Sequence, residues 1–84
     1  MNIADLSEGD KIEIDSHPLR GCPLRVCDVA EADIGLTDVT ACTLSDGERE
    51  YLLQGASHSE QADIVDLDAD ETLEPVSVEE IRKV

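Results

Sequence analysis

The feature that most limits how this chain can fold is its charge. Of its 84 residues, 21 are acidic and 6 are basic, which gives a formal net charge of −15 at pH 7. A compact chain with this excess repels itself in dilute buffer, and the repulsion opposes folding. Two situations accommodate such a charge. Either the chain is disordered, or its solvent holds enough salt to screen the carboxylates, since the Debye length is only ~3 Å at about 1 M salt.

The hydrophobic content decides between these two situations. Disorder requires few apolar residues, whereas 40% of this chain is hydrophobic and its apolar residues recur in strand-like patterns. We therefore expect a folded domain in a salty solvent. In its acidity and its preference for Arg over Lys, the whole chain resembles cytosolic proteins of extreme halophiles, such as small acidic proteins of halophilic archaea. Because their surfaces are acidic whatever they bind, this resemblance weakens the usual inference that an acidic protein avoids nucleic acid.

Length and aromatic content limit the core. A chain of this length corresponds to one domain, residues 1–84, and about 60–65% of the surface of the unfolded chain can be buried on folding. Tyr51 is the only aromatic residue, so aliphatic side chains and cysteines must fill the interior. Such a core leaves little room for the deep pocket of several hundred cubic ångströms that enzymes commonly use. We therefore expect a protein that is not an enzyme and has no cofactor.

The N-terminal residues do not have the pattern of a targeting signal. Met1 is followed by Asn, Ile, Ala and Asp rather than by a basic segment and an apolar run, and no stretch has the length and hydrophobicity of a membrane span. Three cysteines are an odd number, which favours reduced thiols over a disulfide framework. We expect a cytoplasmic protein that does not bind membranes.

Five segments have the patterns of short β-strands. In each, apolar or β-branched residues alternate or cluster, and Gly, Pro or Asp residues separate the segments. The expected strands are residues 11–15, 24–30, 37–44, 48–53 and 62–67. The clearest hairpin joins the third and fourth, because the Asp46-Gly47 step between them supplies the positive φ angles of a tight turn. We expect a turn over residues 31–35 and an acidic connector over residues 68–75.

The C-terminal segment has the pattern of a short helix. Ser77 and Glu80 have the spacing of a capping box. Three apolar residues would share one helical face: Val78, Ile81 and Val84. Basic residues in the last turn would suit the helix dipole.

Together these segments predict a mainly β fold: a small five-stranded antiparallel SH3-like barrel or curled sheet with a short C-terminal helix. The opening segment 6–12, Leu-Ser-Glu-Gly-Asp-Lys-Ile, resembles the first turn and strand of SH3-like barrels, which often place a Gly-Asp pair before an alternating strand. The resemblance implies a barrel over most of the chain. Binding members of that group line their groove with aromatic residues, which this chain lacks except at Tyr51, so their ligands do not carry over.

The cysteines and histidines suggest zinc, but their spacing does not fit. Zinc modules usually present ligands in closely spaced pairs, whereas Cys22 and Cys27 have four residues between them and Cys42 stands alone. We interpret Cys27 and Cys42 as buried core residues of strands and predict no metal site. Residues 66–70 match the start of a calcium-binding loop, but the later positions lack the Gly and Glu that such a loop requires.

The segment from His17 to Arg25 is the candidate binding site. It holds two of the three prolines, a histidine, two arginines and a loop cysteine. Loops that a rigid sheet presents commonly carry function, and arginine is a favoured interface anchor because its guanidinium binds carboxylates or phosphates in a fork. We therefore predict four partner-binding residues: His17, Arg20, Cys22 and Arg25.

No catalytic motif is present, so we interpret the chain as a non-catalytic interaction module that binds a protein partner or itself in a high-salt cytoplasm. A first alternative is a nucleic-acid-binding SH3-like or Sm-like barrel in RNA metabolism or regulation, although the chain lacks aromatic platforms for base stacking. A second is a thiol-based metal or redox role through Cys22, where the neighbouring Arg20 would favour a reactive thiolate.

Overall fold

The computed structural model describes residues 2–15, 19–35, 37–57 and 59–84, which form a strongly curled antiparallel β-sheet. The five main strands are β1 (Lys11–Ile14), β2 (Pro23–Ile34), β3 (Thr37–Ser45), β4 (Glu50–Ala56) and β5 (Gln61–Asp66). Three shorter strands follow: β6 (Glu71–Thr72), β7 (Val76–Ser77) and β8 (Ile81–Lys83). Two single-turn 3₁₀ helices complete the described fold, η1 (Ile3–Asp5) and η2 (Val78–Glu80). The predicted mainly β, curled sheet is confirmed, but the predicted number of five strands is too small.

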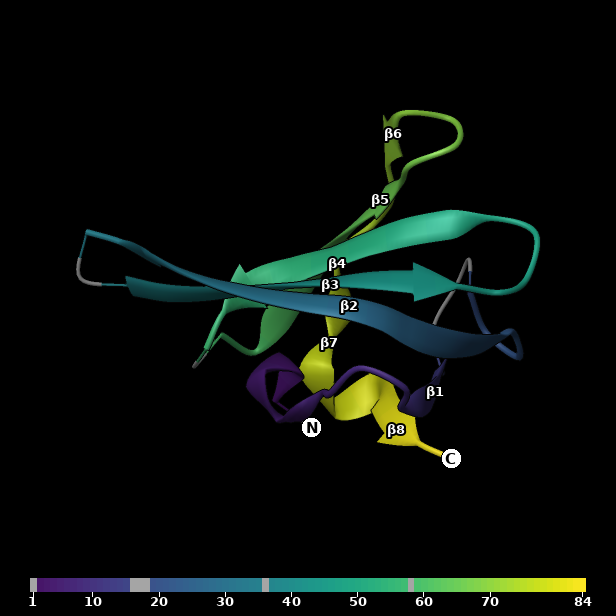
Figure 1. Ribbon diagram of the computed structural model, residues 1–84, viewed down its shortest axis with the longest axis horizontal. Helices are drawn as coiled ribbons and strands as arrows, with labels where there is room; N and C mark the ends of the chain where they lie inside the picture. Colours follow the sequence, from purple (N-terminus) through teal and green to yellow (C-terminus); the bar gives the residue numbers. More distant parts are fainter. Residues whose placement is uncertain (1, 16–18, 36, 58) are drawn as a thin grey trace.

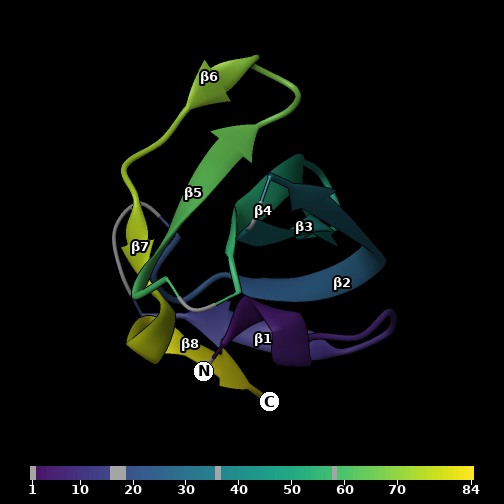
Figure 2. The same ribbon diagram turned by 90° about the vertical axis from the view of Figure 1, so that its left-hand side faces the viewer.

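The strands follow the order β6-β5-β4-β3-β2-β1-β8, and β7 pairs with β5 outside this path. The segment β7-η2-β8 bridges the curl, because β7 pairs with β5 whereas β8 pairs with β1 at the opposite end of the sheet. Figures 1 and 2 show the resulting half-barrel, with β1 and β8 together at the base and β5 and β6 rising away from them. Within the described residues, no helix is long and apolar enough to cross a membrane.

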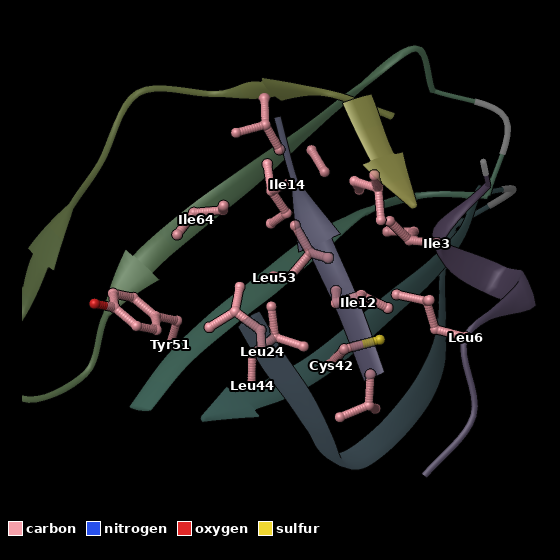
Figure 3. Packing of buried hydrophobic residues seen from close by; sticks show 14 of the residues in the cluster. Ile3, Leu6, Ile12, Ile14, Leu24, Cys42, Leu44, Tyr51, Leu53 and Ile64 are labelled. Carbon is pink, nitrogen blue, oxygen red and sulfur yellow. The ribbon is translucent and has the colours of Figure 1, made fainter. Parts of the chain in front are cut away.

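The concave side of the sheet holds the core (Figure 3). Alternation along each strand directs every second side chain inward; in β3, for example, Cys42 and Leu44 are fully buried while Thr43 between them is half-buried. The N-terminal η1 adds Ile3 to this cluster. Apart from Tyr51 the buried hydrophobic residues are aliphatic or cysteine, as the composition requires: Ile3, Leu6, Ile12, Ile14, Leu19, Leu24, Val26, Cys42, Leu44, Leu53, Ala62, Ile64, Val76 and Ile81.

A β-bulge interrupts β2 and corrects one predicted core position. Val26 pairs with Leu44 and Asp28 pairs with Thr43, so Cys27 is an extra residue with no partner across the ladder. A bulge of this kind shifts the alternation by one residue. Cys27 is therefore exposed, whereas Cys42 is buried as expected.

The predicted C-terminal helix is wrong. Ser77 does cap a turn, since its hydroxyl accepts a hydrogen bond from the Glu79 amide at 3.4 Å, but η2 ends after one turn. Residues 81–83 then pair with β1. The reason is tertiary: β1 offers an unpaired edge, and pairing there buries Ile81, whereas one short apolar face does not sustain an isolated helix.

Two turns also differ from their predictions. Residues 31–34 continue β2 instead of turning, and Ile34 pairs with Thr37 across a two-residue connection. The hairpin between β3 and β4 has a four-residue loop, residues 46–49, in which only Gly47 has a positive φ, +99°. The acidic connector 68–75 contains the short strand β6, which pairs with β5.

Candidate functional site

The predicted binding loop is only partly described, because His17 lies outside the described residues. Leu19 inserts into the core, and its carbonyl accepts a hydrogen bond from the Cys22 amide at 3.0 Å. Gly21 between them has a φ of +79°, a conformation that other residues rarely adopt. Arg20 is exposed, and its guanidinium donates to the Asp15 carbonyl oxygen at 3.4 Å. The loop is thus anchored by a buried leucine while its arginine faces solvent.

Arg25 lies not in the loop but in β2, where it forms part of a cationic pair. It is directly opposite Lys11 of β1, and both side chains are exposed on the convex face of the sheet. In the described structure neither forms an ion pair, whereas Arg49, Arg82 and Lys83 all do. Like charges directly opposite each other destabilise a sheet, and among the described residues no carboxylate forms an ion pair with either cation.

An open groove of about 450 Å³ adjoins the cationic pair. Lys11, Pro23, Arg25 and Cys27 line it on the side of β1 and β2, and the turn at Asp46 lines the other side. Of the four predicted residues only Arg25 lines this groove; Arg20 and Cys22 do not, and His17 is outside the described residues. The composition led us to expect little room for a pocket of this volume, and the curl of the sheet explains the difference, because the groove is an open surface hollow rather than a cavity in the core.

Side-chain hydrogen bonds hold the turn beside the groove. The Asp46 carboxylate accepts hydrogen bonds from the amides of Arg49 at 2.7 Å and Glu48 at 2.8 Å, and these bonds lower the pKa of Asp46. Asp66 also contacts this turn, because its buried carboxylate forms an ion pair with the Arg49 guanidinium at 2.9 Å. Asp66 also accepts the Asp68 and Ala69 amides, so its role is structural.

A second groove, of about 460 Å³, lies at the far end of the β2–β3 pair and is acidic. Its lining includes Glu31, Asp33, Asp38 and Thr40. Asp33 and Asp38 are directly opposite each other across the two strands, and the hydrogen bond and charge of Asp38 raise the pKa of Asp33. Sequence reasoning missed this site because residues 31–35 were interpreted as a turn; the alternation of Val29, Glu31 and Asp33 was the available signal.

The remaining reactive side chains do not form a further site in the described structure. Tyr51 is 7% exposed and burial raises its pKa, so its ring is not available for stacking. Burial raises the pKa of the Cys42 thiol to about 11, which keeps it protonated. Cys22 is half-buried, and all three thiols are free. The described residues contain no group of three or more Cys, His, Asp or Glu side chains placed to hold a metal ion, and both histidines lie outside these residues.

Comparison with known proteins assigns no family: no protein-family model matches this chain, and neither a curated protein nor a solved structure matches it. Any functional inference therefore depends on the chain's own geometry.

Proposed function

We propose that this chain is a non-catalytic interaction module, and that it binds a protein partner at the Lys11–Arg25 groove. One observation carries the proposal. In a chain with a net charge of −15, two cations face each other on an exposed surface without an ion pair in the described structure. A carboxylate supplied by the partner would relieve this repulsion, and the planar guanidinium of Arg25 would hold it in a fork.

The groove supplies the apolar part of such an interface. Pro23 and Leu24 line it beside the two cations, and apolar burial is the main favourable term in most protein association. In the proposed high-salt cytoplasm the apolar contacts would still stabilise the complex, whereas exposed ion pairs would be weakened by screening. Arg25 would then provide orientation and Pro23 a rigid apolar contact.

The resemblance to SH3-like barrels belongs to the same proposal. Two features support it: the curled antiparallel sheet, and the turn at residues 7–10 that leads into the alternating strand β1. The pairing of β8 with β1 would close one side of the barrel.

Self-association and nucleic-acid binding are the competing outcomes. A second copy could occupy the groove with its own acidic surface, which the charge of this chain provides in excess. RNA phosphates would also suit Lys11 and Arg25, but the buried Tyr51 offers no stacking platform. A redox or metal role of Cys22 has less support: all three thiols are free, and the described residues contain no group of three or more Cys, His, Asp or Glu side chains placed to hold a metal ion.

Affinity capture at multimolar KCl tests the proposal. The wild-type chain would be compared with Lys11→Ala/Arg25→Ala and with Arg20→Ala, which removes an exposed arginine outside the groove. We expect the double variant to lose capture of a protein partner by roughly thirtyfold, which corresponds to about 2 kcal/mol for two anchors, and Arg20→Ala to retain it.

Three results would contradict the proposal. Equal capture by all three chains would remove the groove as the binding site. Recovery of RNA, with loss of the captured material after nuclease treatment, would favour the nucleic-acid alternative. A concentration-dependent mass in sedimentation, abolished by Lys11→Ala/Arg25→Ala, would show that the partner is a second copy.

A further inference from the structure

Strand β2 has a neighbour on only one side over its second half. At its start, β2 pairs with β1 over residues 23–25. Val26 then exchanges hydrogen bonds of 2.8 Å with Gly9 and Asp10. From residue 28 to residue 34, β2 pairs with β3 alone among the described residues. Figure 1 shows the β2–β3 pair extending beyond the other strands at this end, and residues 28 and 30–33 are exposed.

The pairing identifies which backbone groups face this open edge. Val26 directs its N–H and C=O toward residues 9 and 10, and so away from β3. Because Cys27 is an extra residue in the bulge, the next residue that faces outward is Val29, followed at intervals of two by Glu31 and Asp33. The Val29 N–H agrees with this outward direction, because it donates to the Asp28 carboxylate at 3.0 Å and not to β3. The outward N–H and C=O groups of Glu31 and Asp33 have no partner among the described residues.

The same residues direct their side chains toward the acidic groove. Glu31 and Asp33 lie opposite Thr40 and Asp38 of β3, and all four line the groove. The pocket therefore collects three carboxylates, and the described structure contains no cation bonded to any of them. Thr40 is 1% exposed, and its hydroxyl forms no hydrogen bond with a described residue. A buried polar group of this kind is costly unless a partner satisfies it.

We propose that the edge of β2 from Val29 to Asp33 binds an extended basic segment of a partner protein as an additional antiparallel strand. The backbone groups of Glu31 and Asp33 would bond the main chain of that segment, which is the usual source of affinity when a strand is added to a sheet edge. The partner residues opposite Glu31 and Asp33 would be Lys or Arg, because cross-strand neighbours share one face. The residue opposite the half-buried Val29 would be apolar.

Charge disfavours self-pairing of this edge. Two copies of this edge paired antiparallel about Glu31 would place that carboxylate directly opposite its own copy, and like charges in this position destabilise a sheet. The inference rests on the proposed role as an interaction module, but it uses a surface that shares no lining residue with the Lys11–Arg25 groove.

A synthetic peptide in which arginine alternates with threonine and ends in valine is a suitable probe. Binding would be measured by calorimetry at the lowest KCl concentration at which the protein is folded. In the proposed register the arginine amides bond β2, and the threonine amides point away. We expect N-methylation of the arginine amides to abolish binding, because these amides donate to β2, and N-methylation of the threonine amides to preserve it. A peptide shifted by one residue would bond through its threonine amides, but every arginine would then lie on the other face.

Hydrogen exchange gives a second readout on the unmodified protein. We expect the peptide to slow exchange of the Glu31 and Asp33 amides, which face the open edge, and to leave the Ala30 and Ala32 amides, which face β3, unchanged. Equal effects of the two N-methylated peptides, or equal protection of all four amides, would overturn the added strand.

Charge variants complete the test. Glu31→Gln/Asp33→Asn keeps the backbone edge and removes two carboxylates, and we expect peptide affinity to fall about tenfold. Asp63→Asn/Glu74→Gln makes the same charge change at two exposed residues outside the groove and should leave affinity within about twofold. Equal losses in both variants would show non-specific attraction to an acidic protein. Lys11→Ala/Arg25→Ala should bind the peptide normally, so failure of this inference and failure of the proposed function are distinguishable.

Discussion

The two ends of the sheet use charge in opposite ways. At the β1–β8 edge, basic and acidic residues face each other: Arg82 contacts Glu13 at 2.6 Å and Asp15 at 2.8 Å, and Lys83 contacts Asp10 at 3.3 Å. At the far end of β2–β3, the groove holds Glu31, Asp33 and Asp38, and no described cation pairs with them.

With six basic residues against 21 acidic ones, this chain neutralises its carboxylates at only some strand pairs. The β1–β8 pairs are partly exposed, and exposed pairs contribute only about 0–1 kcal/mol each. Their effect is to let β1 and β8 pair without repulsion, so that Ile81 of β8 is buried in the core. Among the described residues the β2–β3 end has no such compensation, so we expect its stability to depend on screening by salt or on a partner. Three measurements test this difference between the two ends.

Salt should have the largest effect. Lowering KCl from multimolar to near zero should remove most of the roughly 5 kcal/mol of stability that a small domain has, because carboxylate repulsion is then unscreened. Urea unfolding followed by circular dichroism at several KCl concentrations measures this. Hydrogen exchange should show protection lost at the β2–β3 end at higher KCl than at β1–β8. A cooperative fold with the same stability at every KCl concentration contradicts this prediction.

Truncating the side chain that closes the β1–β8 edge should have the next largest effect. Ile81 is 2% exposed, and replacing it with alanine should lower the free energy of unfolding by about 3 kcal/mol, since a cavity forms in the core. Val84→Ala is the matched control, because Val84 is 76% exposed and its loss should change stability by less than about 0.5 kcal/mol. Equal effects of the two substitutions in urea unfolding would mean that β8 does not seal the core.

The smallest effect is expected at the open end. Thr40→Val removes the buried hydroxyl without changing the shape of the side chain, and should raise the free energy of unfolding by up to about 1 kcal/mol. Thr43 lies on the opposite face of the same strand and is half-buried, so Thr43→Val should change stability little. If Thr40→Val destabilises the protein more than Thr43→Val does, the hydroxyl has a partner within the fold and no longer supports the proposed edge site.

The candidate site could be predicted only in part. Arg25 was identified from its residue type, and it does line a groove; Lys11 was missed because its position opposite Arg25 depends on the β1–β2 register. Glu31 and Asp33 follow the two-residue period of β2, yet the nearby Gly35 suggested an earlier turn. Cys27 was assigned to the core because an unbroken strand pattern does not reveal a bulge.

The fold class, the five main strands and the aliphatic core could be predicted from the residues alone. These follow from local alternation, turn residues and the near absence of aromatic side chains, all of which act within a few residues of the chain. Other features depend on pairing between distant segments and follow only from the folded structure. The edge of β1 makes residues 81–83 a strand instead of a helix, the bulge exposes Cys27, and the β2–β3 register brings Asp33 against Asp38. No local pattern contains this information, because the register between strands, and so each cross-strand contact, is set only when the sheet forms.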